Sequence, residues 1–208
     1  MEEERREKIL DAAESMALKE GYRQFNLDRL SRRLRMSKNT IYSCFSSKEE
    51  LFFAALNRRA SRIIQQLKEI TTMKVSAEEK LYLAGECIVR ETSEMDSRLM
   101  QDLYDIFPEF FDLSQDFFRT VVNYIGKILE EGAKRKEFRI NVNPILLTRI
   151  IRDIGNYLIE QDFIRDSDLS VEKIFSETMG ILMNGILERN KAGGAGGDRR
   201  FPKQKASS

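Results

Sequence analysis

Hydrophobic residues recur at helical spacing along most of the chain. An apolar face made of Ile9, Leu10, Ala13, Met16 and Ala17 predicts a first helix that ends at Gly21, where glycine can leave the helical conformation. Short apolar stripes follow. Leu27, Leu30 and Leu34 predict a second helix, and Ile41 and Phe45 predict a third. Two helices this short need the first one as a scaffold.

Residues that can cap helices stand before each of these stripes. Asn26 and Ser37 can accept hydrogen bonds from the first-turn amides of the second and third helices. Ser47 followed by Glu50 fits the reciprocal capping box, which places the start of a fourth helix just before Leu51. The third helix should therefore end near residues 45–46.

The remaining pattern predicts further helices separated by short linkers. The fourth helix can continue to about Ile70 and so connects the two halves of the chain. Later helices are predicted at 78–94, 97–107, 110–136, 144–161 and 170–190, with Pro108 and Pro144 at boundaries. No run alternates with the period of a strand, so the fold class is all-α with about nine helices.

Composition removes several classes of function. The chain has no histidine, and its two cysteines, Cys44 and Cys87, lack the spacing of a metal site, so we expect no catalytic residues, no metal and no cofactor. The N-terminus MEEERREK is charged where a signal peptide is apolar, and no stretch of about 18 apolar residues occurs. We expect a cytoplasmic protein that does not enter a membrane.

Charge is unevenly distributed although the net charge is only +1. Residues 1–62 carry 14 Lys and Arg against 10 Asp and Glu, and the rest of the chain carries 21 against 24. The excess is densest between Arg23 and Lys38, where six basic residues are opposed by Asp28 alone. Such a stripe beside two short helices is typical of phosphate contact, although a basic run by itself is usually a solvated helix face.

The polar residues of the third helix are candidates for reading base edges in the major groove. Lysine suits guanine acceptors, asparagine suits adenine, and the threonine methyl suits thymine. We therefore predict contacts from Lys38, Asn39, Thr40 and Ser43. The amides at Asn26 and Leu27, at the start of the second helix, can bind a phosphate. The simpler interpretation of Thr40 and Ser43 is a polar surface.

The segment YRQFNLDRLSRRLRMSKNTIYSCFSSKEELFFAAL resembles the N-terminal domain of TetR-type transcriptional repressors. The shared positions are Ser37, Thr40, Tyr42, Phe45, Lys48 and Leu51, with Ala12, Ala13, Gly21 and Phe25 upstream. Through this resemblance, Tyr42 and Lys48 are expected to clamp the DNA backbone. The family usually has Ala-Gly-Val where this chain has Leu34, Arg35 and Met36, and a non-glycine residue at positive φ costs about 1 kcal/mol or more.

The resemblance implies a division of labour along the chain. Residues 3–63 form the DNA-binding domain, with the helix-turn-helix at about 26–45, and 64–190 form a helical ligand-binding and dimerisation domain. Residues 191–208 are Gly-rich and basic, which is typical of a flexible tail. The helices at 144–161 and 170–190 match the pair that forms the dimer interface in TetR-like proteins, and an ordinary intramolecular pair is the alternative.

The expected function is that of a sequence-specific DNA-binding transcriptional regulator, a repressor released by a ligand. Its partners are double-stranded DNA with a palindromic operator, a second copy of the chain and an unidentified small-molecule effector. The aromatic residues between 82 and 124, and Met95 and Met100, can line a ligand cavity or fill a helical core, so no ligand residue is named. The alternative is a non-catalytic interaction module whose basic helical face binds an acidic partner or a membrane surface.

Overall fold

The computed structural model describes residues 2–92, 97–138, 143–159 and 171–186, and these ranges are helical without a β-strand. The helices are α1 (Glu2–Gln24), α2 (Leu27–Leu34), α3 (Lys38–Tyr42), α4 (Lys48–Thr72), α5 (Ala77–Thr92), α6 (Ser97–Ile106), α7 (Phe110–Lys134), α8 (Pro144–Ile159) and α10 (Val171–Ile186). The predicted all-α fold class, with about nine helices, is confirmed for the described ranges. Met95 and the predicted tail at 191–208 lie outside them.

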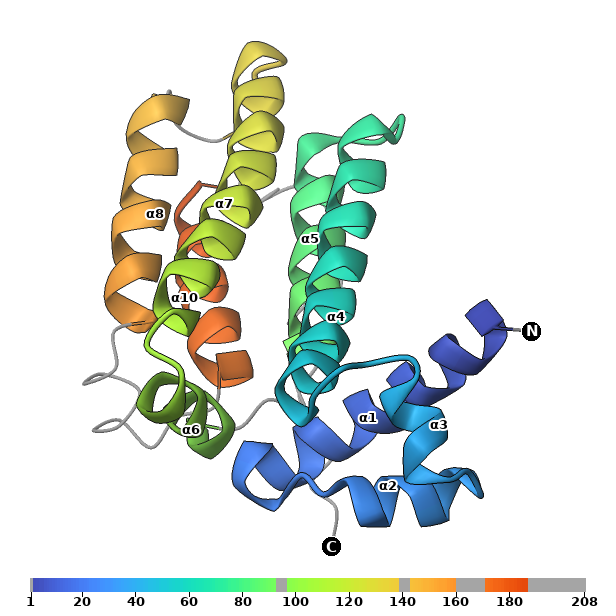
Figure 1. Ribbon diagram of the computed structural model, residues 1–208. Coiled ribbons are helices and arrows are strands. Elements are labelled where there is room, and N and C mark those ends of the chain that lie inside the picture. The colour runs from blue at the N-terminus through green and yellow to red at the C-terminus, as the bar shows by residue number, and fades with distance from the viewer. Residues whose placement is uncertain (1, 93–96, 139–142, 160–170, 187–208) are drawn as a thin grey trace, which may run out of the picture.

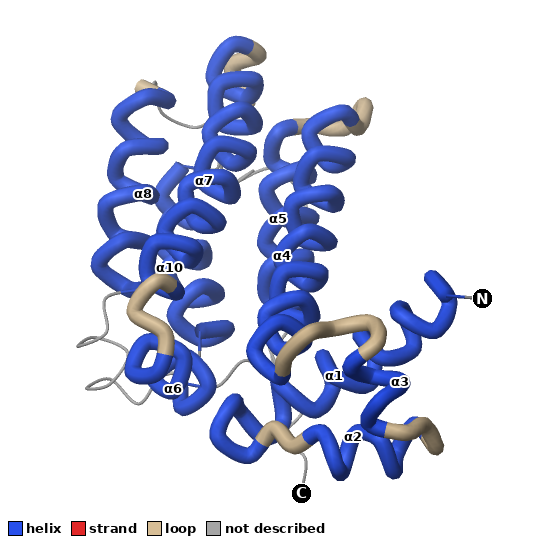
Figure 2. The backbone as a smooth tube through the Cα atoms, viewed as in Figure 1, coloured by secondary structure: helices blue, strands red, loops and turns tan. Residues whose placement is uncertain are grey.

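The helices form two groups that share α4 (Figure 1). The small helices α1, α2 and α3 lie together at the lower right, and α4, α5, α7 and α8 stand roughly parallel above them, with α10 behind α7 (Figure 1). Short loops join α2 to α3 and α3 to α4 (Figure 2). Since α4 runs from one group into the other, it is the connection that its uninterrupted apolar stripe predicts.

Each group has its own hydrophobic core. The first core contains the predicted faces of α1 and α2, Ile41 of α3, Phe45 after α3, and the start of α4. It also takes in Leu99 and Leu103 of α6. The second core packs α4, α5, α7 and Leu147 of α8 together. The division predicted at residues 63–64 therefore falls inside α4, and α6, although it comes later in the chain, packs on the first core.

The first helix does not simply stop at Gly21. The backbone there turns to φ 69°, ψ 178°, a left-handed region that glycine enters without a Cβ clash, and helical turns resume as far as Gln24. A Cβ on Gly21 would also lie 3.3 Å from a carboxylate oxygen of Asp102 in α6. Gly21 thus produces a kink that brings the end of α1 close to α6, rather than the helix end that the sequence predicted.

The three predicted caps are present. Asn26 accepts from the amide of Asp28 at 2.7 Å, Ser37 from Thr40 at 3.1 Å, and Ser47 from Glu50 at 3.0 Å. The other hydrogen bond of the predicted capping box, from the backbone amide of Ser47 to the Glu50 side chain, is not the one that forms. The Glu50 carboxylate accepts from the amide of Ser46 at 2.6 Å instead of from that of Ser47.

The turn between α2 and α3 keeps the geometry that a glycine usually supplies. Arg35 lies at φ 53°, ψ 40°, in the left-handed region. Its amide donates to the carbonyl of Arg32, and the amide of Met36 donates to that of Ser31, which together form the Schellman arrangement that ends a helix. The turn therefore forms without glycine, at the conformational cost that an L-residue pays there.

Arg35→Gly should raise the free energy of unfolding by about 0.5–1 kcal/mol, because the loss of the Cβ clash exceeds the larger entropy of glycine in the unfolded chain. Arg33→Gly is the matched control, since Arg33 lies in α2 and loses helix propensity, which costs about 0.5–1 kcal/mol. Urea unfolding at one fixed protein concentration measures both. If both variants changed the free energy of unfolding in the same direction, the backbone at Arg35 would not be strained.

Candidate DNA-binding interface

The helix α3 is held in place by two buried side chains, one within the helix and one shortly after it. Ile41 and Phe45, which the sequence assigned to the core, are each 1% exposed. The helix ends at Tyr42, earlier than the predicted 45–46, and Ser43 and Cys44 form a turn before Phe45. The amides of Cys44 and Phe45 both donate to the carbonyl of Ile41, so this turn remains compact.

The other face of α3 is directed to solvent. Lys38, Asn39, Tyr42 and Ser43 are exposed, Tyr42 by 47%, and Thr40 is partly buried. All the predicted base-reading residues are therefore brought together on one accessible surface. The Tyr42 side chain is therefore accessible and is not part of the core.

Hydrogen bonds order several of these polar side chains. The hydroxyls of Ser37 and Thr40 lie 2.9 Å apart, and the Ser43 hydroxyl donates to the carbonyl of Thr40 at 2.8 Å. The Lys38 ammonium lies 2.5 Å from the carboxylate of Asp28 in α2. The polar surface of α3 is thus organised before any ligand reaches it.

The N-terminus of α2 has the predicted arrangement only in part. Asn26 is exposed and uses its side chain as the cap, whereas the side chain of Leu27 is buried in the first core. At Leu27 the backbone amide is what can face an anion, because the first amides of a helix have no intrahelical acceptor. The two residues therefore differ in role: one caps, and the other anchors the helix.

Lys48 is more enclosed than a surface clamp. Its ammonium donates to the carbonyl of Tyr22 at 3.0 Å and lies 4.1 Å from the centre of the Tyr22 ring. The Tyr22 hydroxyl in turn donates to Glu49. Burial, followed by this bond to a carboxylate, raises the pKa of Tyr22, and the same bond lowers the pKa of Glu49. Lys48 therefore lies in a fixed position at the end of α1.

The basic stripe between residues 23 and 38 is largely occupied by contacts within the protein. Arg23 pairs with Asp102 of α6 at 2.6 Å, and Arg29 makes two bonds of 2.7 and 2.8 Å to Glu20. The guanidinium of Arg32 donates to the carbonyl of Asp28. The count of basic residues in the sequence therefore exceeds the number of free cations on this surface.

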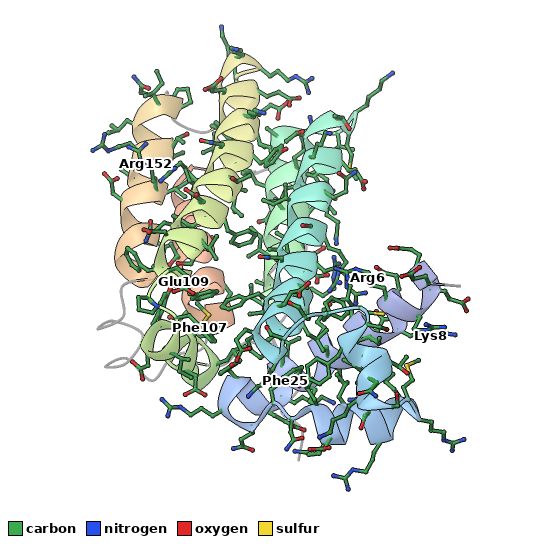
Figure 3. The ribbon with its side chains drawn as sticks, viewed as in Figure 1. Arg6, Lys8, Phe25, Phe107, Glu109 and Arg152 are labelled. Carbon is green, nitrogen blue, oxygen red and sulfur yellow. The ribbon has the colours of Figure 1, made fainter. Side chains whose placement is uncertain are left out.

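Sequence reasoning missed Arg6, which supports the turn after α3. Its guanidinium donates to the carbonyl of Cys44 at 2.7 Å and lies 4.2 Å from the centre of the Phe45 ring (Figure 3). Arg6 comes three residues before Ile9 and so lies near the buried face of α1. That spacing could have marked Arg6 as a contact residue, but not its partner, which is 38 residues away.

Two other features are absent from the described part of the chain. Within it, no group of three or more Cys, Asp or Glu residues could hold a metal ion. No described helix is long and apolar enough to cross a membrane.

Comparison with known proteins agrees with this geometry. Residues 9–55 match the family described as bacterial regulatory proteins, tetR family. The chain is 20% identical to the fatty acid metabolism regulator protein of Bacillus subtilis, over 86% of this chain and 93% of that one. It is 22% identical to the HTH-type transcriptional activator FasR of Mycolicibacterium smegmatis, over 90% and 87% of the two chains.

Solved structures share the fold over the same extent. A putative transcriptional regulator from Saccharomonospora viridis, crystallised in complex with choline, superposes with a TM-score of 0.66 at 22% identity, over 90% of this chain and all of that one. The family match covers α2, α3 and most of α1, and the relatives extend the likeness through the second group of helices. Residues 9–55 therefore match the N-terminal domain of the tetR family of bacterial regulatory proteins, and the relatives that match over most of the chain are regulator proteins.

Proposed function

We propose that this regulator is a homodimeric repressor that binds a palindromic operator and leaves it when a small molecule binds the second group of helices. The observation that carries the proposal is the accessible polar face of α3, which Ile41 and Phe45 anchor to the first core. A rigid helix with small polar side chains suits the major groove, where hydrogen-bond patterns identify bases.

Within this proposal the exposed residues divide into two kinds. Lys38, Asn39, Thr40 and Ser43 contact base edges, and Tyr42, Lys48 and the α2 N-terminus at Asn26 and Leu27 contact phosphates. The first kind gives sequence preference, and the second gives affinity and register. The ordered hydroxyls on α3 and the fixed position of Lys48 support this division.

A dimer is supported by an apolar surface on α8. Ile145, Leu146 and Ile150 are 73%, 57% and 40% exposed, although Leu147 on the opposite side is buried against α7. Ile181 of α10 is 75% exposed. A second copy can cover this surface and place two α3 helices about 34 Å apart.

Ligand control is supported by the way the two cores share α4. Leu51 and Phe52 lie in the first core and Ile63 and Leu67 in the second, so a shift of α4 in the second core reaches α1, α2 and α3. One of the relatives is named as an activator, so repression rather than activation of transcription is itself part of the proposal. To release the operator, the ligand must bind the two states with affinities that differ by a few kcal/mol.

The rival function is an interaction module that binds an acidic protein or a membrane surface through the basic face. Such a surface needs free cations, whereas Arg23 and Arg29 are paired with carboxylates of this chain. Binding of the purified protein to duplex DNA and to vesicles with anionic lipid, measured over a range of salt, separates the two functions. The rival predicts that the vesicles compete with DNA.

The sorting of contacts predicts different effects for two variants. Lys48→Ala should weaken binding to every duplex and reduce the slope of log K against log salt by about 1 per protomer. Asn39→Ala should relax the preference at one base pair in each half-site, with a loss of about 1–3 kcal/mol on the selected operator. Selection from a random DNA pool supplies the operator, and equal effects of both variants on selected and scrambled duplexes would refute the sorting.

The dimer surface predicts that Ile150→Asp converts the dimer to monomers, because a carboxylate would be buried at the interface without a partner. Operator affinity should fall about 100-fold or more, since the two half-sites are no longer bound together. Sedimentation and operator binding measure the two effects. Met73→Asp, at an exposed apolar residue of the α4–α5 loop, is the control that should remain dimeric.

A screen of small apolar and cationic compounds should yield at least one that lowers operator affinity about 10-fold or more and raises the melting temperature of the free protein. The same compound should lower the affinity for a scrambled duplex by a smaller factor than the affinity for the operator. If no compound alters operator affinity, the proposed release by a ligand is wrong, while repression itself is tested separately by a reporter gene placed behind the selected operator.

A further inference from the structure

The Lys38–Asp28 pair is an unusual feature of a surface proposed to contact DNA. Asp28 is the only acidic residue between Arg23 and Lys38, and its side chain is exposed on α2. A carboxylate beside DNA phosphates lowers affinity by like-charge repulsion. An acidic residue in the first turn of a helix does favour the helix dipole, so this simpler role is the one that a test must separate.

Asp28 is held rigidly by its backbone. Its amide donates to the side chain of Asn26 at 2.7 Å, and its carbonyl accepts from the hydroxyl of Ser31 at 3.0 Å and from Arg32 at 3.2 Å. The direction in which its carboxylate leaves α2 is therefore well defined. From there it reaches across the turn to the ammonium of Lys38 at 2.5 Å.

The pair restricts what Lys38 can do. A free lysine has a long flexible side chain and is drawn to any nearby phosphate, which contributes equally on all sequences. With one N–H directed to Asp28, two of its three donors remain. Two donors match the two acceptors of guanine, O6 and N7, in the major groove.

We propose that Asp28 is a positioning residue that sets specificity: it holds the Lys38 ammonium for a base edge and withholds it from the phosphates. This role rests on the proposed reading of DNA by Lys38. Specificity is the difference between two affinities, and Asp28 increases the difference by lowering the affinity for the wrong sequences. Asp28 also lowers the affinity for every DNA sequence, because its carboxylate repels the phosphates.

Asp28→Asn tests the proposal, because it preserves shape and removes the charge. Affinity for a scrambled duplex should rise about 3- to 10-fold, and the slope of log K against log salt should steepen by about 1 per protomer as Lys38 gains a phosphate. The ratio of selected-operator to scrambled-duplex affinity should fall about 10-fold. Urea unfolding of the same variant reports any loss of helix stability.

Two further variants make the result specific to the pair. In a Lys38→Met background, Asp28→Asn should leave the affinity ratio unchanged within about twofold, because there is no ammonium left to direct. Glu20→Gln removes a carboxylate paired to Arg29 on the same domain and is the matched control. It should change affinity for both duplexes equally and leave their ratio intact.

Three results would overturn the proposal. The first is an unchanged ratio in Asp28→Asn with lower stability, which would leave only the helix-dipole role. The second is an equal fall of the ratio in the Lys38→Met background, which would mean that Asp28 acts on DNA directly. The third is a fall of the ratio in Glu20→Gln as large as that in Asp28→Asn. A wild-type protein without any sequence preference would instead contradict the proposed function.

Discussion

The buried carboxylate of Glu14 is the interaction on which the relation between the two groups of helices depends. It accepts hydrogen bonds from the guanidinium groups of Arg58, Arg59 and Arg62 of α4 at 2.5–3.2 Å. Arg59 also donates to the carbonyl of Glu91 in α5 at 2.5 Å. Burial by itself raises the pKa of Glu14, but the hydrogen bonds and charges of Arg62 and Arg58 outweigh this effect and hold the pKa below its ordinary value. The stability that the Glu14 carboxylate contributes is therefore complete at a pH above its pKa in the unfolded chain. This contribution is lost as the pH falls through its lower pKa in the folded protein.

This network restricts how α1 and α4 can move. Separating them would leave buried charges without partners, which costs about 3–5 kcal/mol when one member of such a set is removed. A second contact lies at the other end of α1, where Arg23 pairs with Asp102 of α6 and the Tyr22 ring packs edge-on against Phe107, the residue after α6, at 4.7 Å. The orientation of the DNA-binding helices is thus set by discrete ion pairs and ring contacts on both sides of the kink at Gly21. Discrete contacts of this kind favour a few defined arrangements over a continuous range.

Local features of the fold could be predicted from the sequence, and contacts between distant segments could not. The caps at Asn26 and Ser37 and the buried faces of the short helices depend on residues within a few positions of each other. The kink at Gly21 is different, because it is formed against α6, and Arg6 meets a partner 38 residues away. The polar face of α3 was predicted because helical spacing alone separates it from the buried face. The internal pairing of the basic stripe was missed because residue counts do not show which charges meet.

That pairing changes how DNA attraction should be understood. A free surface cation gains affinity by releasing condensed counterions, but a paired one must first lose its carboxylate or bring that negative charge along. Arg23, Arg29 and Lys38 all have carboxylate partners, at 2.5–2.7 Å. The excess of basic residues in the N-terminal part of the chain therefore contributes less non-specific affinity than its number suggests. A regulator that must find one site among many gains from this, because low affinity for random DNA leaves the base contacts, proposed above for α3, to decide which site it occupies.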